Sequence, residues 1–234
     1  MTLASRGCLL NRVAETRDQF CDFDSNFKLQ FDGSPEFSFL NPVLLDKDIL
    51  WMADAEPTEL IFSDNEKSMI FVIEKAVDRP DPADDIRIEL SFQRLEEQYK
   101  LASIRFDPKL KAMINQDLMD QLAIESAAQN LCSTHWSMAS TKVEVDISAH
   151  DLESLPNRLE ILELLGLPVY QESENDSFGY EYRLKGESQA PALARFTIWF
   201  DDSGQKPARM ESQYSHFHTS TDFVQKKMIM RVKI

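Results

Sequence analysis

Glycine, cysteine and long apolar runs are scarce in this chain of 234 residues. With only six glycines, few loops can cradle a phosphate group, and the sequence contains no P-loop, no dinucleotide-binding fingerprint and no nucleophile elbow. No segment approaches the roughly 18 consecutive apolar residues that a transmembrane helix requires. These absences favour a non-enzymatic protein that holds no cofactor and has no membrane-spanning helix.

Basic residues are also outnumbered by acidic ones. The chain has 40 Asp and Glu residues against 25 Lys and Arg residues, which gives a formal net charge of −15. Such a charge repels the phosphate backbone of nucleic acids at long range, so we expect no nucleic-acid partner. The hydrophobic fraction of 43% is typical of a globular protein that packs its own core.

A pattern of apolar and polar segments occurs twice, at an offset of about 110 residues. In both copies an apolar helical run ends at a small residue and a proline, Pro57 in one and Pro168 in the other. Strand-like runs follow, in which apolar and polar residues alternate at the period of a half-buried strand. The matching strand windows are 27–31 and 142–146, 69–75 and 178–185, 86–92 and 194–200, and 99–106 and 209–216, and the matching N-terminal helical windows are 11–23 and 117–134.

This repeat predicts an α+β fold built from two tandem repeats, each with helices packed on an antiparallel β-meander sheet. The first module covers residues 1–116, of which 1–10 are disordered or form an anchor, and the second covers residues 117–234. The last stretch, 226–234, alternates apolar and charged residues and is expected to be a terminal strand.

Local signals predict the ends of helices and the site of one turn. Asn41 and Ser154 each stand shortly before a proline, so we expect them to cap the N-termini of helices. Gly166, with Pro168 beyond it, is expected to end the second helix. Gly204 closes an Asp-Asp-Ser-Gly hairpin, a composition that suits a residue at positive φ.

Residues 158–204 contain three motifs that occur together in one known family. They are Arg158–Pro168 with its Gly-Leu-Pro end, the aromatic strand Phe178–Tyr182, and Phe196–Gly204 with its acidic turn. They resemble the BamE/SmpA-OmlA family of outer-membrane lipoproteins and, more broadly, the tandem modules of β-lactamase inhibitory protein. The resemblance implies small non-enzymatic α+β modules that present a sheet face or loops to another protein. The first half departs from it, since Ala55 stands where the family has glycine.

Cys8 is a candidate lipid anchor. The pair Gly7-Cys8 resembles the point at which bacterial lipoprotein precursors are cleaved and lipidated. The preceding residues are too few for a signal peptide, and Ser5 stands where leucine is expected. The alternative is a free cysteine at a frayed terminus.

Cys21 and Cys132 occupy equivalent positions in the two copies, 111 residues apart. Residues related by a pseudo-twofold axis meet only on that axis, so a disulfide between them would fix the mutual orientation of the halves. It would also indicate an oxidising compartment. The alternative is two buried thiols at equivalent core positions.

Metal-binding patterns are weak in this sequence. His216 and His218 would share one face of a strand, a spacing that a metal site can use, but solvated strand histidines are the alternative and we predict no metal. The acidic loop from Asp78 to Asp85 lacks the ligand spacing of an EF-hand and is predicted to be a solvated turn.

Together these observations predict a non-enzymatic cell-envelope protein, in the periplasm or lipid-anchored at the outer membrane, that acts as a protein-binding or adaptor module. The alternative is a cytoplasmic protein that holds a small apolar ligand between its two modules, in a groove lined by Trp51, Trp136 or Trp199. An enzyme with an unrecognised site is a further alternative.

Overall fold

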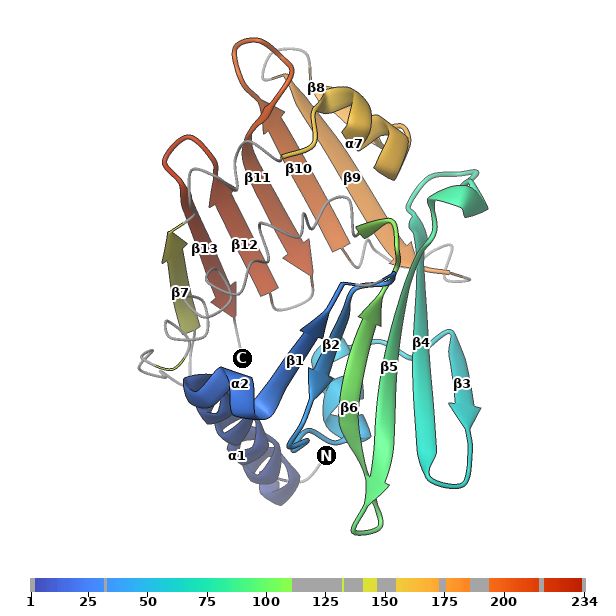
Figure 1. The fold of residues 1–234 in the computed structure, drawn as a ribbon. Coiled ribbons are helices and arrows are strands. Elements are labelled where there is room, and N and C mark those ends of the chain that lie inside the picture. The colour runs from blue at the N-terminus through green and yellow to red at the C-terminus, as the bar shows by residue number, and fades with distance from the viewer. Residues whose placement is uncertain are drawn as a thin grey trace.

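The computed structural model describes residues 3–31, 33–110, 132, 141–146, 155–172, 176–185, 194–214 and 217–232. Within this part, thirteen strands form one antiparallel sheet in the order β1-β2-β6-β5-β4-β9-β10-β11-β12-β13-β7, with β3 beside β4 and β8 beside β9 (Figure 1). The strands are β1 (Phe27–Gln30), β2 (Glu36–Phe39), β3 (Glu59–Phe62), β4 (Glu66–Lys75), β5 (Ile86–Leu95), β6 (Gln98–Phe106), β7 (Thr141–Asp146), β8 (Tyr170–Glu172), β9 (Ser177–Leu184), β10 (Ala194–Phe200), β11 (Pro207–Tyr214), β12 (Phe217–Asp222) and β13 (Lys227–Val232). The helices are α1 (Leu3–Gln19), α2 (Phe23–Asn26), α3 (Asp46–Ala53) and α7 (Arg158–Leu165), with 3₁₀ turns η1 (Phe20–Asp22) and η2 (Pro82–Asp84).

The predicted fold class, two tandem repeats that each place helices on a meander sheet of their own, is wrong. The element order α3-β3-β4-β5-β6 does recur as α7-β8-β9-β10-β11. However, β4 pairs with β9, so the strands of both halves belong to one continuous sheet, and the described residues are far richer in strand than in helix. The predicted division at residue 116 lies outside the described residues and stays a prediction.

The physical reason for the single sheet is that β3 and β8 are too short to cover their neighbours. β3 covers β4 only as far as Ile70, and β8 covers β9 only as far as Gly179. The remaining lengths of these two edges pair with each other, which satisfies backbone groups that would otherwise be open. At the middle of this seam Arg183 Nε lies 3.0 Å from Glu74 Oε1.

Two buried apolar clusters line the sheet, and each draws on both halves of the chain. The cluster around α7 and β9 includes Ile73 and Ile86 from β4 and β5. The cluster around α3, β4, β5 and β6 includes Leu184 from β9. Removing either half would therefore expose apolar side chains of the other half as well as an open strand edge.

Helix ends agree with the sequence signals at the C-terminus of α7 but not at the N-termini. Gly166 follows α7 at φ +65°, as predicted. The cap of α7 is Asn157, whose side chain accepts the backbone N–H of Leu159 and Glu160; the predicted cap Ser154 lies outside the described residues. Asn41 caps no helix, because α3 begins only at Asp46.

Most predicted strands are present, and several unpredicted ones join them. The window 194–200 coincides with β10, β13 occupies most of 226–234, and Gly204 closes its hairpin at φ +68°. The strands β2, β3, β8 and β12 were not predicted. The segment from Leu3 to residue 10, expected to be disordered or an anchor, is the first part of α1. Among the helices described, none has the length and apolar character needed to cross a membrane.

Candidate functional site

β3 presents three consecutive exposed apolar side chains. Leu60, Ile61 and Phe62 are 49%, 52% and 61% exposed. One edge of β3 pairs with β4, and in the described part of the chain no strand pairs with the other edge. In Figure 1, β3 stands outermost beside β4. Because an apolar edge strand with open backbone groups is a template for a further strand, β3 is the candidate site.

A tight turn fixes the geometry of β3. Its two central residues are Asp64 and Asn65, and the N–H of Ser63 donates to the carbonyl of Glu66 at 2.9 Å. From this turn to Glu59, β3 and β4 pair residue by residue without a shift in register. Beyond the end of β3, the backbone of β4 bonds to other groups. Val72 of β4 donates its N–H to Thr58 Oγ1 at 3.0 Å, and its carbonyl accepts the N–H of Lys185, which follows β9.

Phe62 is held in place although its ring is mostly exposed. The Lys67 ammonium lies 5.6 Å from the centre of that ring and 5.9 Å from the centre of the Tyr99 ring. Lys67 is itself buried and paired with Asp46, with Nζ 2.7 Å from Oδ2. A cation held at this distance attracts the face of the ring and favours one ring position.

Exposed carboxylates stand on both sides of β3. Within the strand, Glu59 lies 3.8 Å from Arg87. The flanking carboxylates are Asp54, Glu56, Asp64 and Glu66. In the described part of the chain no ion pair involves any of these four. The apolar centre of β3 is therefore bounded by negative charge at both ends.

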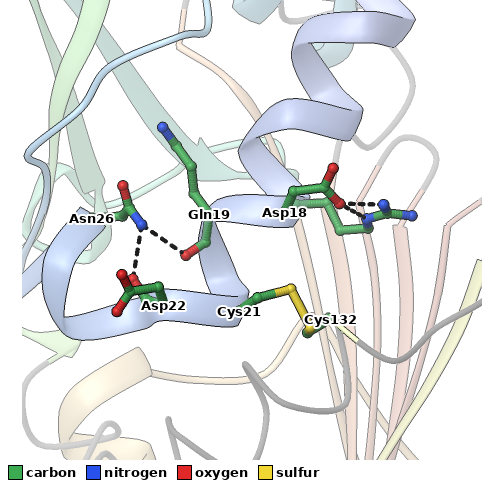
Figure 2. The surroundings of a disulfide bond; sticks show 7 residues. Asp18, Gln19, Cys21, Asp22, Asn26 and Cys132 are labelled. Carbon is green, nitrogen blue, oxygen red and sulfur yellow. Dashed lines mark hydrogen bonds and ion pairs between the residues drawn. A yellow bond between two sulfur atoms is a disulfide. The ribbon is translucent and has the colours of Figure 1, made fainter.

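Cys21 and Cys132 are joined in a disulfide, with their Cα atoms 5.0 Å apart (Figure 2). Cys21 belongs to η1, which continues α1 with helical backbone at Gln19, and the chain turns a corner at Asp22, where φ is −130° and ψ is 70°. Asn26 holds that corner, because its side-chain amide donates to the carbonyls of Gln19 at 3.2 Å and Asp22 at 2.8 Å. The bond connects the segments that precede β1 and β7, which are the two end strands of the sheet path.

A cluster of phenylalanine rings fixes η1 on β1 and β2. The ring of Phe20 stacks on that of Phe27 with 4.4 Å between centroids. The Phe27 ring in turn contacts Phe37 at 5.1 Å and Phe39 edge-on at 5.5 Å. Aromatic contacts of this kind set the position of η1, and hence of Cys21, relative to the sheet.

A buried ion pair lies beside the seam between β4 and β9. The Lys75 side chain is only 4% exposed, and its ammonium donates to Asp84 Oδ2 at 2.6 Å and to the carbonyl of Leu167 at 2.8 Å. Burial, reinforced by the charge of Asp84, raises the pKa of Tyr180 well above its ordinary range. Tyr182 is shifted in the same direction, with burial again the main cause. The ion pair of Lys75 with Asp84 joins the α7 end to the loop before β5, whereas the buried hydroxyl of Tyr182 has no hydrogen-bond partner among the described residues.

A groove of about 530 Å³ runs between α1, the segment before α3 and the β5–β6 hairpin. Its lining includes the charged residues Arg12, Glu15 and Lys100 together with Leu40 and Leu95. It therefore lies within the first half rather than between the halves. Of the tryptophans expected around an apolar ligand, Trp51 and Trp199 are not part of this lining, and Trp136 lies outside the described residues.

The other predicted site residues are dispersed. Cys8 lies within α1, and His218 lies in β12 opposite Gln213 and Arg231. His216 is outside the described residues, so the predicted pairing of the two histidines has no described geometry. Among the residues that the structure describes, no three His, Cys, Asp or Glu side chains gather as metal ligands would.

In the acidic loop, two of the carboxylates bind lysines instead of forming an open turn. Asp84 pairs with Lys75 as above, and Lys185 Nζ lies 2.6 Å from Asp85 Oδ2. Asp81 accepts the N–H of Ala83 at the start of η2. The loop thus connects β4 and β5 to β9.

β3 was not predicted from the sequence. The signal was present: Leu60-Ile61-Phe62 is a run of strand-forming residues, followed by a turn composition at Asp64-Asn65. A run this short does not alternate, so its burial and its open edge could not be inferred from periodicity.

Comparisons with known proteins add little. No protein-family profile matches the sequence, and no curated protein does. Among solved structures, the dehydratase domain from the CurK module of curacin polyketide synthase is 10% identical, with 86% of this chain and 90% of that chain covered and a TM-score of 0.14. A conserved protein of unknown function with a hot dog fold from Alicyclobacillus acidocaldarius is 8% identical, with 88% and 96% covered and a TM-score of 0.14. At scores this low the likeness carries no argument about fold or activity.

Proposed function

We propose that this chain is a non-enzymatic protein-binding module of a cell envelope and that the exposed strand β3 is its contact surface. The observation that carries the proposal is the row of Leu60, Ile61 and Phe62, each about half exposed on an edge strand. Contiguous exposed apolar side chains on a soluble fold mark interaction sites far more often than scattered ones do. The proposal assigns no catalytic step and no nucleic-acid partner to the chain.

Two observations support the envelope location. The disulfide between Cys21 and Cys132 suits an oxidising compartment, where such bonds persist. The likeness of residues 158–204 to an outer-membrane lipoprotein family points to the same place. Lipid anchoring at Cys8 is the finer part of the proposal, and cell fractionation tests it: a Cys8→Ser variant should leave the membrane fraction, whereas the natural chain should stay there.

Site-specific photo-crosslinking in the native host tests the binding function. A photoreactive phenylalanine analogue at position 62 should give a defined crosslinked protein band. The matched control is the same analogue at position 224, because Val224 is 75% exposed but lies in the turn between β12 and β13. Equal crosslinking from both positions, or none from position 62, would show that β3 is not the contact surface.

A second candidate function, the binding of a small ligand, has the groove beside α1 in its favour. Arg12 is already bound by Asp48, so Lys100, which lies 3.6 Å from an exposed carboxylate of Glu96, is the cation of this lining that suits a polar or anionic ligand rather than the apolar one expected from the sequence. Since neither described tryptophan, Trp51 nor Trp199, lines it, a thermal-shift screen of small anions is a better test than intrinsic fluorescence. A stabilisation that disappears in Lys100→Met would support this second candidate.

A further inference from the structure

The open edge of β3 can extend the sheet by one more strand. In an antiparallel pair, residues alternate between those bonded to the neighbour and those whose N–H and C=O point away. Ser63 is bonded to Glu66, so Ile61 and Glu59 also bond to β4, and the register continues without a shift. The N–H and C=O groups of Leu60 and Phe62 consequently point outward, away from β4.

Apolar side chains would cover an incoming strand on both faces. Leu60 and Phe62 lie on one face of the sheet, and Ile61 lies on the other. An added strand would therefore contact apolar groups above and below its own backbone. Of the devices that blunt natural edge strands, β3 has a short length and one charged residue, Glu59, but no Lys, Pro or bulge.

Charge selects the occupant of this edge. The carboxylates at both ends of β3, Asp54 and Glu56 on one side and Asp64 and Glu66 on the other, have no ion pair in the described part of the chain. Antiparallel pairing with β3 of a second copy would bring these acidic ends together, and each copy carries a net charge of −15. A partner segment with basic ends would instead face opposite charges.

We propose that β3 binds an extended segment of a partner protein by strand addition, and that this segment is apolar at its centre and carries Lys or Arg at both ends. This inference rests on the proposed protein-binding function and names the chemistry of the partner. Main-chain hydrogen bonds to Leu60 and Phe62 supply affinity, and the flanking charges supply selectivity.

Fluorescence anisotropy with a panel of labelled peptides tests the inference on the intact, oxidised protein. Each peptide has alternating Val and Leu at its centre and a pair of lysines at each end. Replacing the lysines by glutamates should weaken binding at least about tenfold, an effect that added salt should diminish because salt screens the charges. Equal binding of the acidic peptides would overturn the charge selection.

Backbone methylation isolates the hydrogen bonds. Two isomers of the best peptide carry N-methyl groups on alternate residues, so that in one isomer the methyl groups face β3 and in the other they face away. One isomer should lose binding and the other should keep it. If both bind equally, or if no peptide of the panel binds, strand addition is wrong.

A protein variant tests the same bonds from the other side. Leu60→Pro removes an outward N–H without removing a bond to β4, so it should abolish binding while the β3–β4 hairpin persists. Leu60→Val is the matched control: it keeps the N–H and an apolar side chain suited to a strand, and it should retain most of the affinity. If Leu60→Pro does not fold, as judged by circular dichroism, the methylated peptides decide the question on the natural chain.

The outcomes separate this inference from the proposed function. A specific crosslink at position 62 together with binding that ignores N-methylation would keep the protein-binding function and overturn strand addition. A chain that forms dimers in sedimentation, which Leu60→Pro dissociates, would assign the edge to a second copy and overturn the basic partner. Absence of the crosslink would overturn the function itself.

Discussion

The ammonium of Lys75 has almost no access to water, so its carboxylate partner carries much of its stabilisation. Asp84→Asn leaves that buried cation without a counter-charge and should lower the free energy of unfolding by about 2 kcal/mol. Lys75→Met should cost less, because Asp84 is 24% exposed and can be solvated when the cation is gone. Urea denaturation of both variants measures their free energies of unfolding, and a larger decrease in Lys75→Met than in Asp84→Asn would contradict this prediction.

Buried tyrosines make stability depend on alkaline pH. Burial raises the pKa of Tyr180, Tyr182 and Tyr214, so the folded chain holds these protons more tightly than the unfolded chain does. Their contribution to stability is complete below the ordinary tyrosine pKa of about 10 and is lost progressively as the pH rises above it. Tyrosinate absorbance should show three of the five tyrosines ionising only as the protein unfolds. Ionisation of all five near pH 10 in the folded protein would refute this.

At the scale of elements, α7 depends on a cap that sequence reasoning misplaced. Asn157 accepts two backbone N–H groups, and Glu160 accepts the N–H of Asn157 at 2.7 Å. Asn157→Ala should therefore lower the free energy of unfolding by about 1 kcal/mol. Leu159→Ala on the same helix is the control and should change it by less than about 0.5 kcal/mol, since Leu159 is 66% exposed. Thermal denaturation of the two variants makes the comparison.

The strands themselves were largely predictable, and their pairing was not. Alternation identified β10 and most of β4, β5 and β9, because period-two patterns follow from one buried and one exposed face. The β4–β9 pairing depends on how much of each edge β3 and β8 leave open. That is a property of strand length and backbone hydrogen bonding, which side-chain patterns do not encode.

The candidate site shows the same limit. The sequence contains the apolar run Leu60–Phe62 and the acidic residues around it, so its chemistry was available. What makes it a site is the outer edge of β3, with which no strand pairs in the described part of the chain, and strand pairing of this kind is not encoded in the apolar run itself.

At the scale of the whole molecule, the disulfide closes a loop of 111 residues and restricts the unfolded chain. Replacing both Cys21 and Cys132 by serine should lower the free energy of unfolding by about 4 kcal/mol. The control is Cys8→Ser, which removes a thiol outside this bridge and should change it by less than about 0.5 kcal/mol. In protein produced without lipidation, alkylation without reductant, followed by mass spectrometry, should modify only Cys8 of the three cysteines. Modification of all three would show that the bridge does not form.

The same bond decides which part of the chain bears a mechanical load. Tension applied between the two ends of the chain passes from Cys21 directly to Cys132, so the strands β1 to β6, all lying between these residues, are bypassed. The strand β3 therefore lies in a covalent loop that is outside the covalent path of the load. Reduction would place that loop under tension and lengthen the tether by up to about 400 Å, at roughly 3.6 Å per residue.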